Sequence, residues 1–201
     1  MKRTILPIAA LLLSTVVHAE WLNTDNTDEI TGKRTVSAFS YVYKQDESIG
    51  VRCDVSDNKK SIMLTFNADN ALGTPRTNVD MFVKVDDNQP ISFRGQLYTN
   101  SYRAGYVNAS GETEADVSKL LAQMIAGNKA YVKIQNDRRS EIVDFNVSLS
   151  GFTAKSKKAL SACSFNPKAR EITPEDKARL SEISSELKKL QSEKTAILSK
   201  Y

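Results

Sequence analysis

Apolar and polar residues alternate along most of the chain between residues 35 and 149, which is the period of a β-strand with one buried face. The clearest run is Ser48–Val55, in which Ile49, Val51 and Cys53 share one face. A glycine, an arginine and an aspartate occupy the other face. Further strands are expected at residues 35–43, 62–66, 79–85, 91–95, 131–134 and 142–149.

Short polar turns separate the first three of these strands, so we expect them to pair as an antiparallel meander. Before them, residues 20–33 are polar and acidic and read as a solvated lead-in, with Trp21 pinning its start against the core. Residues 96–108 carry three tyrosines at four-residue spacing. This segment is either one bent strand or two short strands broken at Asn100-Ser101.

The period of the apolar residues changes from two to about 3.6 in two places, one within this region and one just after it. Residues 115–126 have helical spacing and are followed by Gly127, a typical helix stop. Gly151 precedes a second short helix, which we expect to end near Cys163. Together these elements predict a mainly β (α+β) fold, an antiparallel β-sandwich-like domain with two short helices.

A third helix is predicted beyond a boundary at Asn166-Pro167-Lys168. Thr173-Pro174-Glu175-Asp176 supplies an N-cap, a proline in the first turn and acidic residues near the helix N-terminus. Apolar residues follow at three-four spacing over about three heptads, with Lys194 at the remaining seam position. The seam consists of Leu180, Ile183, Leu187, Leu190 and Ile197. Because so short a helix is marginal alone, the seam packs either on the chain's own domain or on a helix of another molecule.

The N-terminal segment has the pattern of a secretory signal peptide. A basic start precedes an apolar run from Ile5 to Val17, which is too short to span a bilayer, and small residues lead up to Ala19. We expect cleavage between Ala19 and Glu20, and a periplasmic or secreted protein that does not span the membrane. Cleavage removes two of the 28 basic residues and none of the 24 acidic ones, so the net charge falls from +4 to +2.

The chain is therefore predicted to have three parts: a signal peptide (1–19), a β-rich globular domain (20–166), and a linker with an amphipathic C-terminal helix (167–201). Cys53 and Cys163 are the only cysteines. In an oxidising compartment we expect them to pair. Closing a loop of about 110 residues stabilises the fold by a little under 5 kcal/mol in the chain-entropy model. Two free buried thiols are the alternative.

Several kinds of chemistry are excluded or disfavoured. His18, the only histidine, is lost with the signal peptide, which excludes Ser-His-Asp and Cys-His catalysis and imidazole metal sites. No phosphate-binding glycine-rich loop is present. Asp25, Asp28 and Glu29 do not have the spacing of a calcium loop. We expect no catalytic residue, no metal site and no cofactor.

Arginines and tyrosines cluster between residues 94 and 106, and the candidate contact residues among them are Arg94, Tyr98, Tyr102 and Arg103. Nucleic-acid binding is not expected, because residues 20–165 hold 18 basic and 18 acidic side chains and so lack a basic footprint. Tyr and Arg are enriched in protein–protein hot spots. The cluster is therefore either a protein-contact face or ordinary decoration of the strands.

The order of these features resembles a known family. A Trp soon after the cleavage site, a strand ending in Val51-Arg52-Cys53, a strand over Val79–Asp86, a Leu120-Leu121 helix and a short Ala-rich helix closing at Cys163 are similar to the periplasmic, type VI secretion-associated VasI/TagO family and to related small exported prophage proteins. The resemblance covers residues 21–165. It implies no enzymatic activity, and it carries over Trp21, Cys53, Asp86 and Cys163 as structural positions only.

We therefore expect a non-enzymatic periplasmic protein that binds an unknown envelope protein, or itself, through the C-terminal helix, in a setting associated with secretion. One alternative is a prophage-encoded envelope protein that blocks an envelope target or a superinfecting phage. Another is an enzyme that uses carboxylates or a metal.

Overall fold

The computed structural model describes residues 20–41, 46–57, 59–168 and 174–199, so the predicted signal peptide lies outside the described residues. The chain divides into two compact units, Met1–Lys168 and Ala169–Tyr201. The described residues of the first unit form the strands, the disulfide and two helices. The second contains the C-terminal helix.

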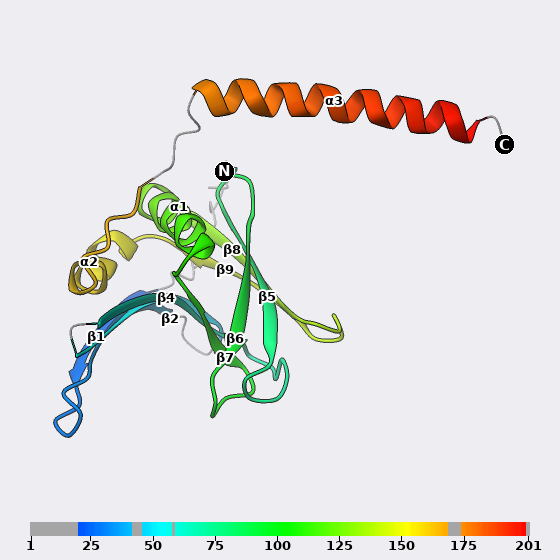
Figure 1. Ribbon diagram of the computed structural model, residues 1–201. Helices are drawn as coiled ribbons and strands as arrows, with labels where there is room; N and C mark the ends of the chain where they lie inside the picture. The colour runs from blue at the N-terminus through cyan, green and yellow to red at the C-terminus, as the bar shows by residue number, and fades with distance from the viewer. Residues whose placement is uncertain (1–19, 42–45, 58, 169–173, 200–201) are drawn as a thin grey trace, which may run out of the picture. The chain divides into compact units, whose positions relative to one another are not determined.

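The first unit is mainly antiparallel β, as predicted, and its strands form one continuous sheet (Figure 1). The nine strands lie in the order β1-β2-β3-β4-β7-β6-β5-β8-β9. In chain order they are β1 (Glu20–Thr27), β2 (Arg34–Tyr41), β3 (Ser48–Ser56), β4 (Lys59–Asn67), β5 (Asn78–Val85), β6 (Ile91–Leu97), β7 (Ala104–Asn108), β8 (Lys129–Asn136) and β9 (Ile142–Ser148). The two helices of this unit are α1 (Glu112–Ala126) and α2 (Phe152–Ala162).

A single curled sheet, a half-barrel, takes the place of the two stacked sheets that a sandwich would have. The pairing of neighbouring strands is shortest between β6 and β7. There Gln96 pairs with Tyr106 and Leu97 pairs with Gly105. A Cβ atom on Gly105 would lie 2.4 Å from the Phe66 ring and 2.4 Å from the Gln96 carbonyl oxygen. Glycine therefore lets the backbone and a large ring approach closely where the two halves of the sheet meet.

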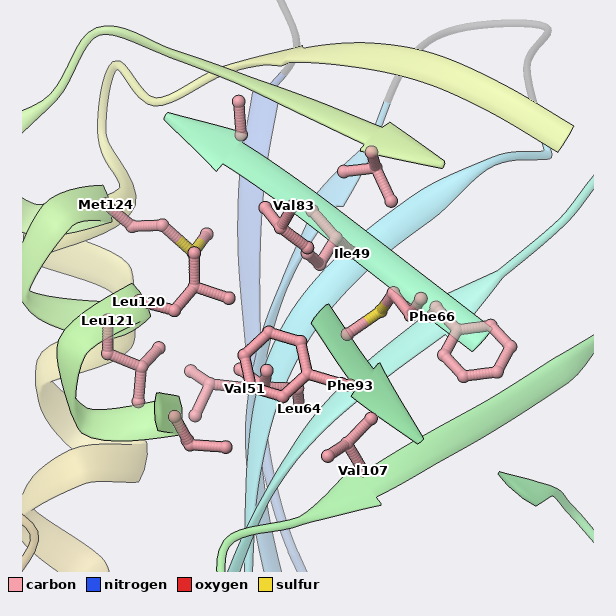
Figure 2. Close-up of a cluster of buried hydrophobic side chains, with 14 of the residues drawn as sticks. Ile49, Val51, Leu64, Phe66, Val83, Phe93, Val107, Leu120, Leu121 and Met124 are labelled. Atoms are coloured by element: carbon pink, nitrogen blue, oxygen red, sulfur yellow. The ribbon is translucent and has the colours of Figure 1, made fainter. Parts of the chain in front are cut away.

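The hydrophobic core lies on the concave face of the sheet, under the two helices. α2 contacts β1, β2 and β3, whereas α1 contacts β5 and β6. Figure 2 shows Leu120, Leu121 and Met124 of α1 pointing toward side chains of the strands, among them Val51 and Phe93. Alternate residues of the strands are fully buried there, as the period of two predicts.

The predicted solvated lead-in is wrong for its first eight residues, because Glu20–Thr27 forms the edge strand β1. It pairs with β2 along its full length, from Glu20 opposite Tyr41 to Thr27 opposite Arg34. Polar side chains are typical of an edge strand, since they oppose pairing with other chains. The role predicted for Trp21 is confirmed: its ring is 2% exposed and packs edge-on against Phe152, at 4.7 Å between centroids.

The remaining elements follow the predictions closely. The tyrosine-rich segment is two strands rather than one bent strand, because β6 ends at Leu97 and β7 begins at Ala104. Between them the Ser101 hydroxyl accepts a hydrogen bond of 2.8 Å from the Ala104 N–H and holds the turn. Helix α1 begins at Glu112, three residues before the predicted start.

The predicted disulfide between Cys53 and Cys163 is present, with the two Cα atoms 5.7 Å apart. It joins β3 to the residue that caps the C-terminus of α2. A disulfide fits an oxidising, extracytoplasmic location. Within the described ranges, no helix has both the length and the apolar character needed to cross a membrane.

The second unit contains one helix, α3 (Pro174–Leu198), of 25 residues. Its start at Pro174 agrees with the proline predicted for the first turn.

Candidate functional site

The main candidate for a binding surface is the apolar seam of α3. Leu187, Leu190 and Ile197 are 54–61% exposed, and Ile183 is 42% exposed. Leu180 lies within the helix, but its side chain is outside the described part of the structure. Leu198, which lies outside the predicted seam, is also exposed (64%) and lies beside Ile197, so it widens the apolar surface at the C-terminal end.

The seam has the spacing of a short coiled coil, and its two flanks differ in charge. In heptad notation the a positions are Leu180, Leu187 and Lys194, and the d positions are Ile183, Leu190 and Ile197. On the g flank lie Arg179, Glu186 and Glu193, and on the e flank lie Ser184, Gln191 and Leu198. A narrow apolar stripe, flanked on one side by the acidic residues Glu186 and Glu193, is suited to contact with another helix.

Of the four arginines and tyrosines predicted as a contact face, three have side-chain partners within the globular unit. Arg94 donates a hydrogen bond to Asp80 at 2.7 Å, and Arg103 donates one to Asp46 at the same distance. Tyr98 is partly buried and stacks on Tyr106, with the ring centroids 5.1 Å apart. The fourth, Tyr102, is 59% exposed. Both arginines therefore have charge partners within the protein, and a binding role for the four residues stays a prediction.

The convex face of the sheet has a half-buried ionic network centred on Asp54. Arg52 donates two hydrogen bonds to its carboxylate, at 2.7 and 2.9 Å, and Lys33 forms an ion pair with it at 2.9 Å. Burial alone would raise the pKa of Asp54, but the hydrogen bonds from Arg52 and Lys33 outweigh burial and lower it. Burial raises the pKa of the nearby Tyr98. These satisfied groups have the character of a structural network.

Asp25, one of the acidic residues considered for a calcium loop, is held by two cations. Arg34 donates two hydrogen bonds to it, both of 2.8 Å, and Lys158 of α2 approaches to 2.8 Å. These hydrogen bonds hold the pKa of Asp25 far below its usual range, and the bonds from Arg34 have the largest effect. Asp28 instead accepts the backbone N–H groups of Ile30 and Thr31, at 2.8 and 2.9 Å, as a turn-forming aspartate does.

The globular unit has a surface hollow lined by aromatic and charged side chains. It lies over β5, β8 and β9 and is lined by Phe82 and Tyr131 together with Lys84, Lys133 and Asp144. Lys129 places its ammonium group 4.7 Å from the centre of the Tyr131 ring. In the part of the chain that the structure describes, no three His, Cys, Asp or Glu side chains are grouped closely enough to hold a metal ion.

No protein family, curated protein or solved structure matches this chain. The resemblance to the VasI/TagO family therefore stays a prediction. The four positions that the resemblance carries over have structural roles in this chain. Trp21 is a core residue, and Cys53 and Cys163 form the disulfide. The Asp86 carboxylate accepts the backbone N–H groups of Asn128 and Lys129, each at 2.9 Å.

Proposed function

We propose that this is a non-enzymatic protein of the periplasm that binds another protein through the seam of α3. The observation that carries the proposal is the row of apolar side chains on α3, at 42–64% exposure for the five described members. Regularly spaced apolar residues on a polar helix are typical of helix-to-helix contact and are costly to leave in water. The disulfide-closed globular unit is then the folded body that carries the helix.

The test is capture of partners from a periplasmic extract after crosslinking, with two matched variants. Leu187→Asp with Leu190→Asp places two charges in the seam. Ser185→Asp with Ser192→Asp places the same two charges on the opposite side of the helix, at the f positions. We expect the seam variant to lose the crosslinked partner and the control variant to keep it. Equal capture by the two variants would contradict the proposal.

The alternative for the seam is packing against the chain's own globular unit, and truncation separates the two. Removal of residues 169–201 leaves the hydrogen bond of 3.0 Å from the Lys168 N–H to the Ser118 hydroxyl in place. For a partner-binding helix, the truncated protein should keep the denaturation midpoint of the full chain and lose its partners. A large drop in the midpoint would mean that the seam belongs to the core of the protein.

The biological setting is a separate part of the proposal. An accessory role in secretion and a prophage-encoded block of an envelope target are the two settings, and the neighbouring genes distinguish them. Secretion-sheath genes favour the first setting, and phage lysis or immunity genes favour the second. A carboxylate- or metal-dependent enzyme is the remaining alternative, and Asp25, Asp54 and Asp80 are engaged by arginine or lysine rather than grouped in a pocket.

A further inference from the structure

We propose that the partner of α3 is a second copy of α3, joined as a parallel, in-register, two-stranded coiled coil. This inference rests on the proposed function, because it assigns a partner to the seam. It makes the protein a dimer in which the N-terminal ends of the two α3 helices lie at the same end of the coiled coil.

The first support is the self-complementarity of the seam in register. Two parallel copies place each seam residue opposite itself, so that leucine faces leucine and isoleucine faces isoleucine. The apolar layers formed in this way are Leu180, Ile183, Leu187, Leu190 and Ile197. Lys194 makes the one polar layer.

The second support is the charge beside Lys194. In a parallel coiled coil, a side chain at an a position lies next to the preceding g residue of the other helix. That residue is Glu193, so each Lys194 ammonium group reaches the Glu193 carboxylate of the second copy. The like charges of the two lysines are thereby compensated by two attractive pairs related by symmetry.

The antiparallel arrangement is opposed by the same charges. With the seams fully overlapped, antiparallel helices bring g residues opposite g residues, so that Glu186 of each copy would face Glu193 of the other. Lys194 would then lie opposite Ile183 with no acidic neighbour to compensate it. In the parallel arrangement the g residues meet e positions instead, and these hold Ser184, Gln191 and Leu198, none of which is charged.

The position of Lys194 also favours two helices over three or four. Leucine at a with isoleucine at d tends toward larger bundles. In a two-stranded coil, however, a lysine stem can run along the core and place its ammonium group at the surface. A larger bundle would bury that charge, which is costly.

The experiment uses the oxidised chain from Glu20 to Tyr201 in sedimentation equilibrium over micromolar to millimolar concentrations. Three heptads associate weakly, so we expect a concentration-dependent dimer. Glu193→Lys gives two adjacent basic residues, and Lys194→Glu gives two adjacent acidic residues. Each variant alone should dimerise about fivefold to tenfold more weakly, because the attractive pairs become repulsive. An equimolar mixture of the two should regain association at least as tight as that of the unmodified protein.

Lys188→Glu is the matched control, because it makes the same charge change at a b position, away from the seam, and should leave dimerisation unchanged. An unmodified protein that stays monomeric overturns the inference, as does a mixture that associates no better than the separate variants. Capture of a foreign protein that is lost with Leu187→Asp and Leu190→Asp would then leave the proposed function standing. If the protein shows no self-association and captures no partner through the seam, both proposals are overturned.

Discussion

The indole N–H of Trp21 donates a hydrogen bond of 2.8 Å to the carbonyl oxygen of Ser148, 127 residues away in the chain. Trp21 lies at the start of β1 and Ser148 at the end of β9, so this bond joins the two edge strands of the sheet. Next to it, the Trp21 ring packs against Phe152, the first residue of α2. The open side of the half-barrel is thus closed at one end by a side chain and covered by a helix.

Substitutions of Trp21 should therefore separate the stability that comes from its packing from the stability that comes from its hydrogen bond. Trp21→Ala removes a fully buried ring and should lower the free energy of unfolding by about 3–5 kcal/mol. Trp21→Phe keeps most of the ring but leaves the Ser148 carbonyl without its donor, and should cost about 1–2 kcal/mol. Urea denaturation followed by circular dichroism measures both. Asn23→Ala, at an exposed position of the same strand, is the control and should change stability little. Equal losses for Ala and Phe would show that the hydrogen bond, rather than the packing, dominates.

The disulfide is expected to contribute a large share of the stability. Replacing Cys53 and Cys163 together with alanine reopens a loop with a sequence separation of 110 residues. The chain-entropy model gives a loss of about 5 kcal/mol. Denaturation midpoints of the oxidised protein and the double variant measure the loss.

Non-reducing peptide mass spectrometry of exported protein should find Cys53 linked to Cys163. Free thiols in that material would contradict the architecture.

Asp86, which directly follows β5, should stabilise the start of β8. Its carboxylate accepts two backbone N–H groups of residues 128 and 129, and Asp86 itself has a φ of 45°, which Asp and Asn tolerate better than other residues. Asp86→Ala should therefore cost about 1–3 kcal/mol. Asp86→Asn, which keeps an acceptor and the backbone preference, should cost less. Asp87→Ala, at the exposed neighbouring position, is the control; a similar loss there would argue against the capping role.

The network around Asp54 predicts a loss of stability in acid. In the folded protein the pKa of Asp54 lies below 3.8, the ordinary value for an aspartate. Its charged form therefore stabilises the fold above pH 3.8, and this stabilisation is lost as the pH falls through the lower, folded-state pKa. The free energy of unfolding should decline between about pH 5 and pH 2. Asp54→Asn should reduce that slope without abolishing it, because the pKa values of Asp25 and Asp28 are lowered too. An unchanged slope would mean that Asp54 titrates as it does in the unfolded chain.

Local patterns were enough to predict most of the elements. Strands β2 to β5 and the helices follow from alternation, helical spacing and glycine stops, because one buried face imposes its period on the residues. The edge strand β1 was missed, since its Asn, Thr and Asp residues carry a turn signal rather than a strand signal. Strand β1 is held in place by backbone pairing with β2 and by the buried side chain of Trp21. Neither of these produces an alternation of apolar and polar residues in the sequence.

The candidate site was predictable in its spacing but not in its full extent. The apolar seam of α3 is a property of one helix, so its members follow from heptad spacing alone. Leu198 was missed because it falls at an e position, outside the strict a/d pattern. The arginine–tyrosine cluster was ambiguous for a different reason. Whether Arg94 and Arg103 are available for a partner depends on Asp80 and Asp46, which are distant in sequence.

Residue types and local spacing were enough to predict the mainly β class and the amphipathic C-terminal helix. The pairing of the two cysteines followed from their number and from the oxidising compartment expected for an exported chain. That the strands form one curled sheet rather than two stacked sheets follows from pairings in the folded chain that no local pattern encodes. The sheet is continuous through the pairing of β7 with both β4 and β6, and its two edges are joined by the bond from Trp21 to Ser148. Both bring together residues far apart in the chain, and a periodic pattern carries no information about which distant residues meet.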